Sequence, residues 1–284
     1  MSKLIENYYN FMAEEEERRL FKDYYHRLEY IVTMYYINKH FPKSGRVLDC
    51  GCGPGHYAIA LARRGYNVAL VDISSKLLSI AREKFRRENL EDRILAVVKT
   101  SSTNLKVFSD NFFDAALCLG PMYHLITEEE KRRTAKELFR VLKPRGVLIV
   151  AAISYFGVLG TILARYPEEI LDEKHKEVFE KGIWRASKYY TGKHVFPDAY
   201  FWKPLELKEF LEKHGFETVE MAACEGIFTH LREQVNEAGK DIKKWHKIIE
   251  LVIRTSNDPT IVGHTEHFLW IGKAKKIGNM GAES

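Results

Sequence analysis

A short glycine-rich segment has the residue types of a ligand-binding turn. It reads Asp49-Cys50-Gly51-Cys52-Gly53-Pro54-Gly55 and follows the apolar residues Val47 and Leu48. Glycines suit such a turn because they adopt positive φ and let a ligand approach the backbone. A second acidic residue, Asp72, ends the next apolar run, where a carboxylate can accept hydrogen bonds from a ribose diol. The spacing predicts a ligand at the carboxyl ends of two neighbouring parallel strands.

Two classes of ligand use this design, and the charge of Asp49 separates them. Dinucleotide-binding enzymes carry Gly-x-Gly-x-x-Gly, with the pyrophosphate at a helix N-terminus. Here the spacing from Gly51 to Gly55 is Gly-x-Gly-x-Gly, and Asp49 precedes it. A carboxylate there repels a pyrophosphate but attracts the ammonium of an amino-acid moiety. The residues favour S-adenosylmethionine over NAD, and a glycine-rich turn that binds no ligand is the remaining alternative.

Alternating strands and helices must position this turn. We expect strands at residues 46–50, 67–72, 93–98, 113–119, 147–152, 216–223 and 266–274. We expect helices at residues 56–64, from the N-cap Ser74 to about 87, at 128–142 and at 204–214. This alternation predicts an α/β fold with a mostly parallel sheet and helices on both faces.

The remaining segments define the expected domain organisation. Residues 1–40 are expected to form a helical N-terminal arm, because helical spacing continues without Gly or Pro from Leu4 to His40. Residues 41–284 are expected to form the main domain, with cap-like insertions at about 154–203 and 226–262. The first insertion is mixed, not strand-like and rich in aromatic residues. Its densest aromatic group consists of Tyr189, Tyr190, Phe196, Tyr200, Phe201 and Trp202. These rings either line a lid over a binding site or only attach the insertion to the core.

The composition is that of a globular protein without a membrane segment. Of the 284 residues, 45% are hydrophobic and 29% charged, and no apolar run approaches the ~20 residues that span a bilayer. No apolar signal-peptide segment stands near the start, so we expect a cytoplasmic protein with no membrane partner. The net charge is +5, but the basic residues are interleaved with acidic ones, and this pattern does not indicate a nucleic-acid partner. The oligomeric state is left open.

Two further counts bear on chemistry and habitat. The four cysteines include Cys50 and Cys52 in Cys-Gly-Cys, which is not the spacing of a zinc or redox site, so we expect reduced thiols and no metal. Gln234 is the only glutamine, whereas Lys and Glu are abundant. That bias is expected of a heat-adapted, thermophilic protein.

The segment from Val47 to Gly55 resembles motif I of the class I methyltransferases, which have a Rossmann-like fold. The resemblance covers about residues 46–153 and extends to 204–274. It implies a seven-stranded, mostly parallel sheet whose last strand is antiparallel, with S-adenosylmethionine as the cofactor. It also implies that Gly51 and Gly53 lie under the methionine part of the cofactor.

The resemblance assigns further cofactor contacts. Cys52 and Gly55 belong to the same turn, Asp72 would hold the ribose hydroxyls, and Ile73 would pack on the adenine. Many family members carry an Asp after the third strand that meets the adenine amino group. This chain has hydroxyl residues there instead, so Ser101 or Ser102 would bind the adenine edge.

A second match lies at residues 112–125 and continues to Gly146. It resembles the small-molecule branch called the methyltransferase type 11 group. In that branch the loop after the fourth strand closes the cofactor pocket and faces the methyl acceptor. Leu119 and Gly120 would then flank the methionine moiety.

Candidate catalytic residues follow directly in the chain. His124 is our candidate general base, because an imidazole titrates near neutral pH; the alternative is a histidine that packs or caps the next helix. Tyr123 either lines the acceptor pocket, with its ring toward the methyl cation, or packs in the core. Tyr8 and Tyr9 would form part of a lid or a plain core contact.

The expected function is methyl transfer to a small-molecule acceptor by in-line displacement, which depends mainly on positioning and exclusion of water. A nucleic acid or protein acceptor is the alternative. Residues 120–123 partly match the Asn-Pro-Pro-Tyr loop of amino-methylating nucleic-acid enzymes but lack its amide. An NAD-dependent oxidoreductase and a non-enzymatic cofactor-binding protein are further alternatives, since a fold alone does not define a function.

Overall fold

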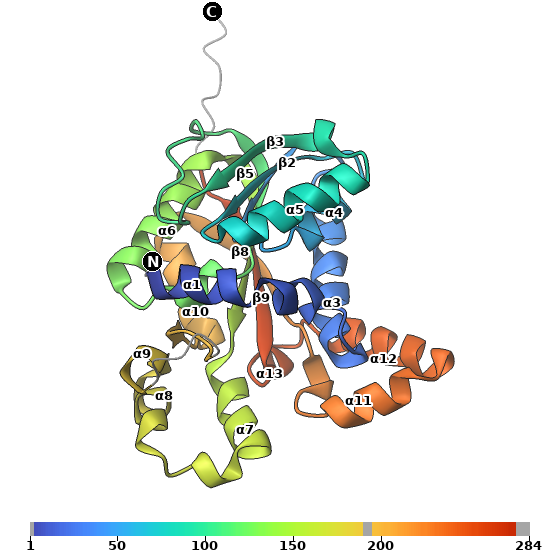
Figure 1. The fold of residues 1–284 in the computed structure, drawn as a ribbon, viewed down its shortest axis with the longest axis vertical. Coiled ribbons are helices and arrows are strands. Elements are labelled where there is room, and N and C mark those ends of the chain that lie inside the picture. The colour runs from blue at the N-terminus through green and yellow to red at the C-terminus, as the bar shows by residue number, and fades with distance from the viewer. Residues whose placement is uncertain (1–2, 190–194, 277–284) are drawn as a thin grey trace, which may run out of the picture.

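A seven-stranded sheet forms the centre of the molecule (Figure 1). The computed structural model describes residues 3–189 and 195–276. The strands lie in the order β3-β2-β1-β4-β5-β9-β8. Their bounds are β1 (Arg46–Cys50), β2 (Asn67–Asp72), β3 (Ile94–Lys99), β4 (Phe113–Cys118), β5 (Leu142–Ile153), β8 (Phe216–Ala223) and β9 (His267–Ala274). The last strand, β9, is antiparallel to β5 and β8. The predicted fold class is confirmed.

Helices cover both faces of the sheet because each strand sends its side chains alternately into two hydrophobic clusters. In β1, Val47 belongs to one cluster and Leu48 to the other, and both are fully buried. The helices of the first cluster are α3 (Tyr24–His40), α4 (His56–Ala62), α5 (Ser75–Arg87) and α12 (Ile242–Thr255). Those of the second include α6 (Glu128–Val141) and α10 (Pro204–Lys213). Parallel strands are stable when both faces are covered in this way.

The N-terminal segment is helical and is divided into three helices. It forms α1 (Lys3–Phe11), α2 (Ala13–Arg19) and α3. The carboxylate of Asp23 accepts a hydrogen bond from the backbone N–H of His26 at 2.9 Å. This N-cap stabilises a new helix start. The division into an arm at 1–40 and a domain at 41–284 stays a prediction.

Two segments project from the sheet near the predicted insertions (Figure 1). The first contains α7 (Tyr155–Arg165), α8 (Lys176–Lys181), α9 (Ala186–Tyr189), β6 (Ile183–Trp184) and β7 (Ala199–Tyr200). The second contains α11 (Arg232–Gly239), α12 and α13 (Pro259–Val262). Because β6 and β7 pair as a small antiparallel sheet, the prediction that the first insertion is not strand-like is wrong there.

Shorter features complete the chain. Single 3-10 turns lie at Glu91–Arg93, Pro121–His124, Pro167–Glu169, Glu173–His175 and Gly226–Phe228. The strand β5 begins at Leu142, earlier than the predicted residue 147, so residues 143–146 belong to the strand. Among the described helices, none combines the length and apolar character needed to cross a bilayer.

Candidate active site

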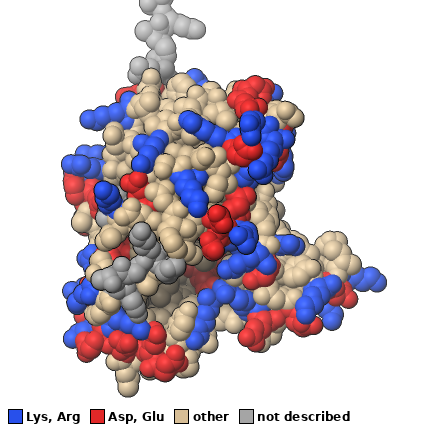
Figure 2. Space-filling view, viewed as in Figure 1, with Lys and Arg blue, Asp and Glu red and all other residues tan. Residues whose placement is uncertain are grey.

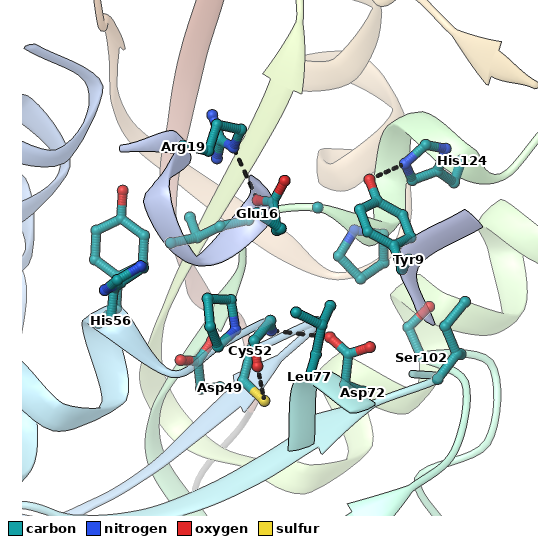
Figure 3. Close-up of a pocket in the computed structure, with 18 of the residues that line it drawn as sticks. Tyr9, Glu16, Arg19, Asp49, Cys52, His56, Asp72, Leu77, Ser102 and His124 are labelled. Carbon is teal, nitrogen blue, oxygen red and sulfur yellow. Dashed lines mark hydrogen bonds and ion pairs between the residues drawn. The ribbon is translucent and has the colours of Figure 1, made fainter. Parts of the chain in front are cut away.

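A cavity lies at the carboxyl ends of β1, β2 and β4 (Figure 3). Side chains of α1 and α2 form the wall opposite these strands, so both helices cover this edge of the sheet. The predicted cofactor residues that line the cavity are Asp49, Gly51, Cys52, Gly53, Asp72, Ile73, Ser102, Leu119 and Gly120. The predicted catalytic residues Tyr123 and His124 line it as well.

The glycine turn after β1 forms the floor of the cavity. The backbone N–H groups of Gly51 and Cys52 donate to the carbonyl of Val71 at 2.7 and 3.0 Å, which ties the turn to β2. Gly51 has φ +77°, and a Cβ there would lie 2.6 Å from Cδ of Pro121. Gly53 has φ +52°, and a Cβ there would meet no atom within 4 Å. Gly51 is therefore required for packing, whereas Gly53 leaves open space where a ligand can approach the backbone.

Two buried carboxylates stand beside this turn (Figure 3). Asp49 is 1% exposed, and within the described residues its Oδ2 has no hydrogen-bond partner. Burial, with a contribution from Asp72, raises the pKa of Asp49 to about 7. Asp72 accepts hydrogen bonds from the N–H of Gly53 at 2.9 Å and of Ser74 at 2.8 Å, and burial raises its pKa to about 6. A buried, unpartnered acceptor such as Asp49 Oδ2 is satisfied best by a cationic donor.

Two predicted cofactor residues do not line the cavity. Gly55 is the N-cap of α4 at φ +79°, and a Cβ there would lie 3.0 Å from Cβ of Ala81. Its small size therefore serves the packing of α4 against α5. The hydroxyl of Ser101 accepts a hydrogen bond from the Thr103 hydroxyl at 3.0 Å and is turned into its own loop. Of the two serines named for the adenine edge, only Ser102 reaches the cavity.

His124 is held at both ring nitrogens. Its Nε2 lies 2.7 Å from the hydroxyl of Tyr9, and its Nδ1 lies 3.1 Å from the backbone carbonyl of Asp198. Burial lowers the pKa of His124 to about 4, so the ring is neutral at physiological pH. Burial also raises the pKa of Tyr123, whose ring packs edge-on to His124. Of the two lid candidates on α1, Tyr9 lines the cavity and Tyr8 does not.

The structure adds an ion cluster that the sequence analysis missed. Arg19 of α2 donates to both carboxylate oxygens of Glu29 at 2.6 and 3.1 Å, and its Nε donates to Glu16 at 2.8 Å. All three side chains line the cavity. Burial disfavours the charge on Glu29, but Arg19 outweighs it and lowers the pKa of Glu29 to about 2. The i, i+3 spacing of Glu16 and Arg19 is the one feature of the sequence that could have indicated this cluster. The same spacing is equally typical of a solvated helix face.

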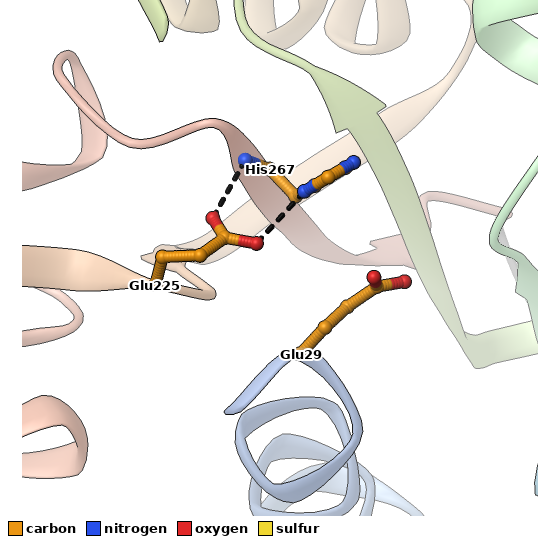
Figure 4. A group of neighbouring side chains, drawn as sticks. All are labelled: Glu29, Glu225 and His267. Carbon is orange, nitrogen blue, oxygen red and sulfur yellow. Dashed lines mark hydrogen bonds and ion pairs between the residues drawn. The ribbon is translucent and has the colours of Figure 1, made fainter. Parts of the chain in front are cut away.

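Glu29 also belongs to a group with Glu225 and His267, whose nearest side-chain atoms lie within 4.8 Å of one another (Figure 4). Glu225 accepts hydrogen bonds from Nδ1 and the backbone N–H of His267, each at 2.8 Å. Burial opposes the charged ring, but the Glu225 carboxylate outweighs it and raises the pKa of His267 to about 9. A protonated imidazole does not bind a metal, and Arg19 occupies both oxygens of Glu29. The group is an ion-pair network, and we propose no metal there.

The aromatic residues of the first insertion do not act as one group. The ring of Phe196 lies 5.4 Å from that of His124, beside the cavity. Tyr200 and Trp202 instead pack around the ammonium of Lys131, at 3.2 and 4.5 Å from their ring centres. Phe201 is buried within the insertion. Tyr189 is partly exposed, and Tyr190 lies outside the described residues.

Comparison with known proteins identifies a methyltransferase domain in the first half of the chain. Residues 47–146 match the family model described as a methyltransferase domain. The chain is 24% identical over 208 residues to a Bacillus subtilis protein named as a methyltransferase, YqeM, covering 72% of this chain and 80% of that protein. It is 37% identical over 115 residues to a glycine/sarcosine N-methyltransferase of Aphanothece halophytica, covering 40% and 42% of the two chains. The match assigns residues 47–146 to the methyltransferase domain, as the resemblance of motif I predicted.

A solved structure has the same fold along nearly the whole chain. It is a Thermotoga maritima S-adenosylmethionine-dependent methyltransferase, described as a possible histamine N-methyltransferase, with a TM-score of 0.60 and 22% identity. The superposition covers 95% of this chain and 99% of that one. S-adenosylmethionine is the cofactor named for that structure, and it is the cofactor that the sequence of this chain predicts. The unpartnered oxygen of Asp49 and the open space at Gly53 fit a ligand that carries an ammonium.

Proposed function

We propose that this methyltransferase acts on a small-molecule acceptor that shares the cavity with the cofactor. The observation that carries the proposal is the cover that α1 and α2 form over one side of the cavity. Tyr9 of α1 is hydrogen-bonded to His124 across it. A concave site covered in this way suits small ligands better than a segment of a macromolecule. The relatives named as glycine/sarcosine N-methyltransferases support an acceptor of this size.

We assign the cofactor contacts from the hydrogen-bonding groups that line each side of the cavity. Asp49 would accept the ammonium of the methionine part, above the turn of Gly51, Cys52 and Gly53. On the other side, the free lone pairs of the Asp72 carboxylate would accept the ribose hydroxyls. The residues that would border the remaining parts of the cofactor are Ile73, Ser102, Leu119 and Gly120.

The protein's part in the reaction is positioning. When bound, S-adenosylmethionine supplies a methyl group on a sulfonium that leaves as a neutral thioether, without needing an acid. The covered cavity orients the acceptor and excludes water, which supplies most of the catalysis in such a displacement. We propose that His124 positions the hydroxyl of Tyr9 and is not itself the general base, because both of its ring nitrogens are engaged. Tyr9 and Tyr123 then face the acceptor.

The other hypotheses have less support. The match to a methyltransferase domain argues against an NAD-dependent oxidoreductase. No feature of residues 3–189 and 195–276 favours a nucleic acid or protein as the acceptor. We further propose a cytoplasmic location, which the four free, buried cysteines support, since thiols stay reduced there.

The proposal is tested by measuring S-adenosylhomocysteine release with three groups of acceptors: small amines, phenols and acids; unmodified tRNA; and a peptide library. We expect turnover only with members of the first group. Turnover with tRNA or peptides, and with no small molecule, would overturn the proposed acceptor class while leaving the cofactor assignment intact.

A further inference from the structure

The direction of the hydrogen bond between Tyr9 and His124 can be worked out from its neighbours. The backbone carbonyl of Asp198 can only accept, so the Nδ1 of His124, 3.1 Å away, carries the proton. Since the ring is neutral, Nε2 holds a lone pair and accepts from the hydroxyl of Tyr9 at 2.7 Å. The Tyr9 oxygen therefore has only lone pairs left to offer, and the neighbouring Tyr123 hydroxyl also hydrogen-bonds to it. It can accept a hydrogen bond from a ligand but cannot donate one.

A second group on the same side of the cavity, the carboxylate of Glu16, can also only accept hydrogen bonds. Oε1 of Glu16 accepts from Nε of Arg19 at 2.8 Å, and within the described residues Oε2 of Glu16 has no hydrogen-bond partner. Both oxygens of Glu29 are taken by Arg19. Arg19 is thus outnumbered by two carboxylates, and Oε2 of Glu16 is the free charged atom of this wall. Figure 3 shows Glu16 and Tyr9 on the side opposite Asp49 and Asp72.

The lining of the cavity as a whole is also negatively charged. Its ionisable groups are the carboxylates of Glu16, Glu29, Asp49 and Asp72, the guanidinium of Arg19, and histidines whose pKa is lowered by burial. With the carboxylates ionised, the formal charge is −3. S-adenosylmethionine, with a sulfonium, an ammonium and a carboxylate, neutralises one of these charges. The remaining negative charge attracts a cationic acceptor and repels an anionic one. The rings of Tyr9 and Tyr123 attract cations as well.

We propose that the acceptor is a basic amine, bound through its N–H groups to the Tyr9 oxygen and to Oε2 of Glu16. This inference rests on the proposed function and narrows its substrate class. The amine binds as an ammonium and loses one proton to water before reaction. Its nitrogen lone pair then forms the N–C bond as the C–S bond breaks, giving a neutral thioether and a methylated ammonium. Glu16 and Tyr9 accept hydrogen bonds from the remaining N–H groups of the neutral amine, so its lone pair is directed toward the methyl group.

The test uses matched sets of small molecules with the same carbon skeleton and three different heads. One set is 2-phenylethylamine, 2-phenylethanol and phenylacetate, and ethyl and imidazolylethyl sets vary the size. Binding is measured by calorimetry on the full chain saturated with S-adenosylhomocysteine. We expect at least one amine to bind ten times more tightly than its alcohol, with no measurable binding of the acids. If no amine exceeds its alcohol, or if an acid binds best, the amine assignment is wrong.

Two variants of α2 locate the contact. In Glu16→Gln the side chain keeps an oxygen for Arg19 but loses its charge, and we expect amine binding to weaken at least fivefold. Glu15→Gln is the matched control, because Glu15 is exposed on the same helix and does not line the cavity. Both variants should bind S-adenosylhomocysteine within threefold of the wild type. An equal effect of the two variants on amine binding would overturn the role of Glu16. Failure of the wild type to bind S-adenosylhomocysteine would instead refute the proposed function itself.

Discussion

The hydroxyl of Tyr9 lies 2.7 Å from Nε2 of His124 and joins helix α1 to the turn that follows β4. The two residues are 115 positions apart, so the contact exists only in the folded chain. It links the cover of the cavity to the turn after β4. Under our proposal this contact determines which hydrogen-bonding groups the acceptor meets, so the position of His124 matters more than its basicity.

The protonation of His124 is the first prediction. Because the carbonyl of Asp198 accepts from Nδ1 and burial lowers the pKa, we expect the neutral Nδ1–H tautomer down to about pH 5. Long-range ¹H–¹⁵N spectra of the imidazoles measure this directly, with His124→Asn to assign the signal. An Nε2–H tautomer, or a titration centred near the ordinary 6.5, would contradict both the positioning role and the acceptor geometry.

The second prediction concerns the open space at Gly53. In Gly53→Ala the methyl group would project into the cavity, and the positive φ would cost about 1 kcal/mol of stability. We expect affinity for S-adenosylhomocysteine to fall at least tenfold. Gly65→Ala is the matched control, since Gly65 has φ +89° and also meets no atom within 4 Å but lies outside the cavity. Similar affinities of the two variants would show that Gly53 does not contact the cofactor.

The third prediction separates affinity from stability at Asp49. The pKa of this carboxyl is raised from 3.8 to about 7, chiefly by burial. Between these values the unfolded chain is ionised while the folded chain keeps its proton, so wild-type stability decreases as the pH rises from about 4 to 7. The variant Asp49→Asn has no ionisable group at this position. Its free energy of unfolding should therefore rise by about 2–4 kcal/mol relative to the wild type over that interval, as measured by urea unfolding of the free protein.

The same variant should bind S-adenosylhomocysteine at least tenfold more weakly, because a charge-assisted hydrogen bond to the ammonium is lost. If Asp49→Asn changes neither the stability nor the affinity for S-adenosylhomocysteine, Asp49 is not part of the cofactor site.

The fourth prediction uses His267, whose pKa is raised from 6.5 to about 9 by Glu225 against the effect of burial. The folded chain holds the extra proton, so this contribution to stability is complete below pH 6.5 and is lost as the pH rises through 9. The stability advantage of the wild type over His267→Gln should shrink by up to about 3 kcal/mol between pH 6.5 and 9.5. A constant difference across this range in urea unfolding would show that the ring is not charged in the folded state.

Local patterns were enough to predict the floor of the cavity. The predicted bounds of β1, β2 and β8 agree with the structure. β1 and β2 are apolar runs that end at glycine or an acidic residue, whereas β8 alternates polar and apolar residues after Gly215. The turn from Asp49 to Gly53 and the end of β2 at Asp72 meet at one edge, as parallel strands require. Gly55 belongs to the same glycine-rich motif as Gly53, but its small size serves helix packing and not ligand binding. Periodicity cannot separate these two uses of glycine.

The opposite wall was missed because distant contacts determine its place. The charged run of α2 is typical of a solvent-exposed helix, yet Glu16 and Arg19 line the cavity. The neighbouring helix α1 is fixed by Asn10, whose side-chain oxygen accepts from the Ser74 hydroxyl at 2.8 Å, and by the ion pair of Glu6 with Lys99 at 2.6 Å. Such pairs join residues more than 60 positions apart, and no local pattern indicates them.

The central claim is that this cavity holds S-adenosylmethionine through Asp72, and calorimetric titration of the purified protein with S-adenosylhomocysteine tests it most directly. Asp72→Ala serves as the site variant, Gly65→Ala as the control and NADH as the rival ligand. We predict micromolar binding of S-adenosylhomocysteine to the wild type and to Gly65→Ala, its loss in Asp72→Ala, and no binding of NADH. Absence of binding to the wild type, unchanged binding in Asp72→Ala, or tighter binding of NADH would contradict the account.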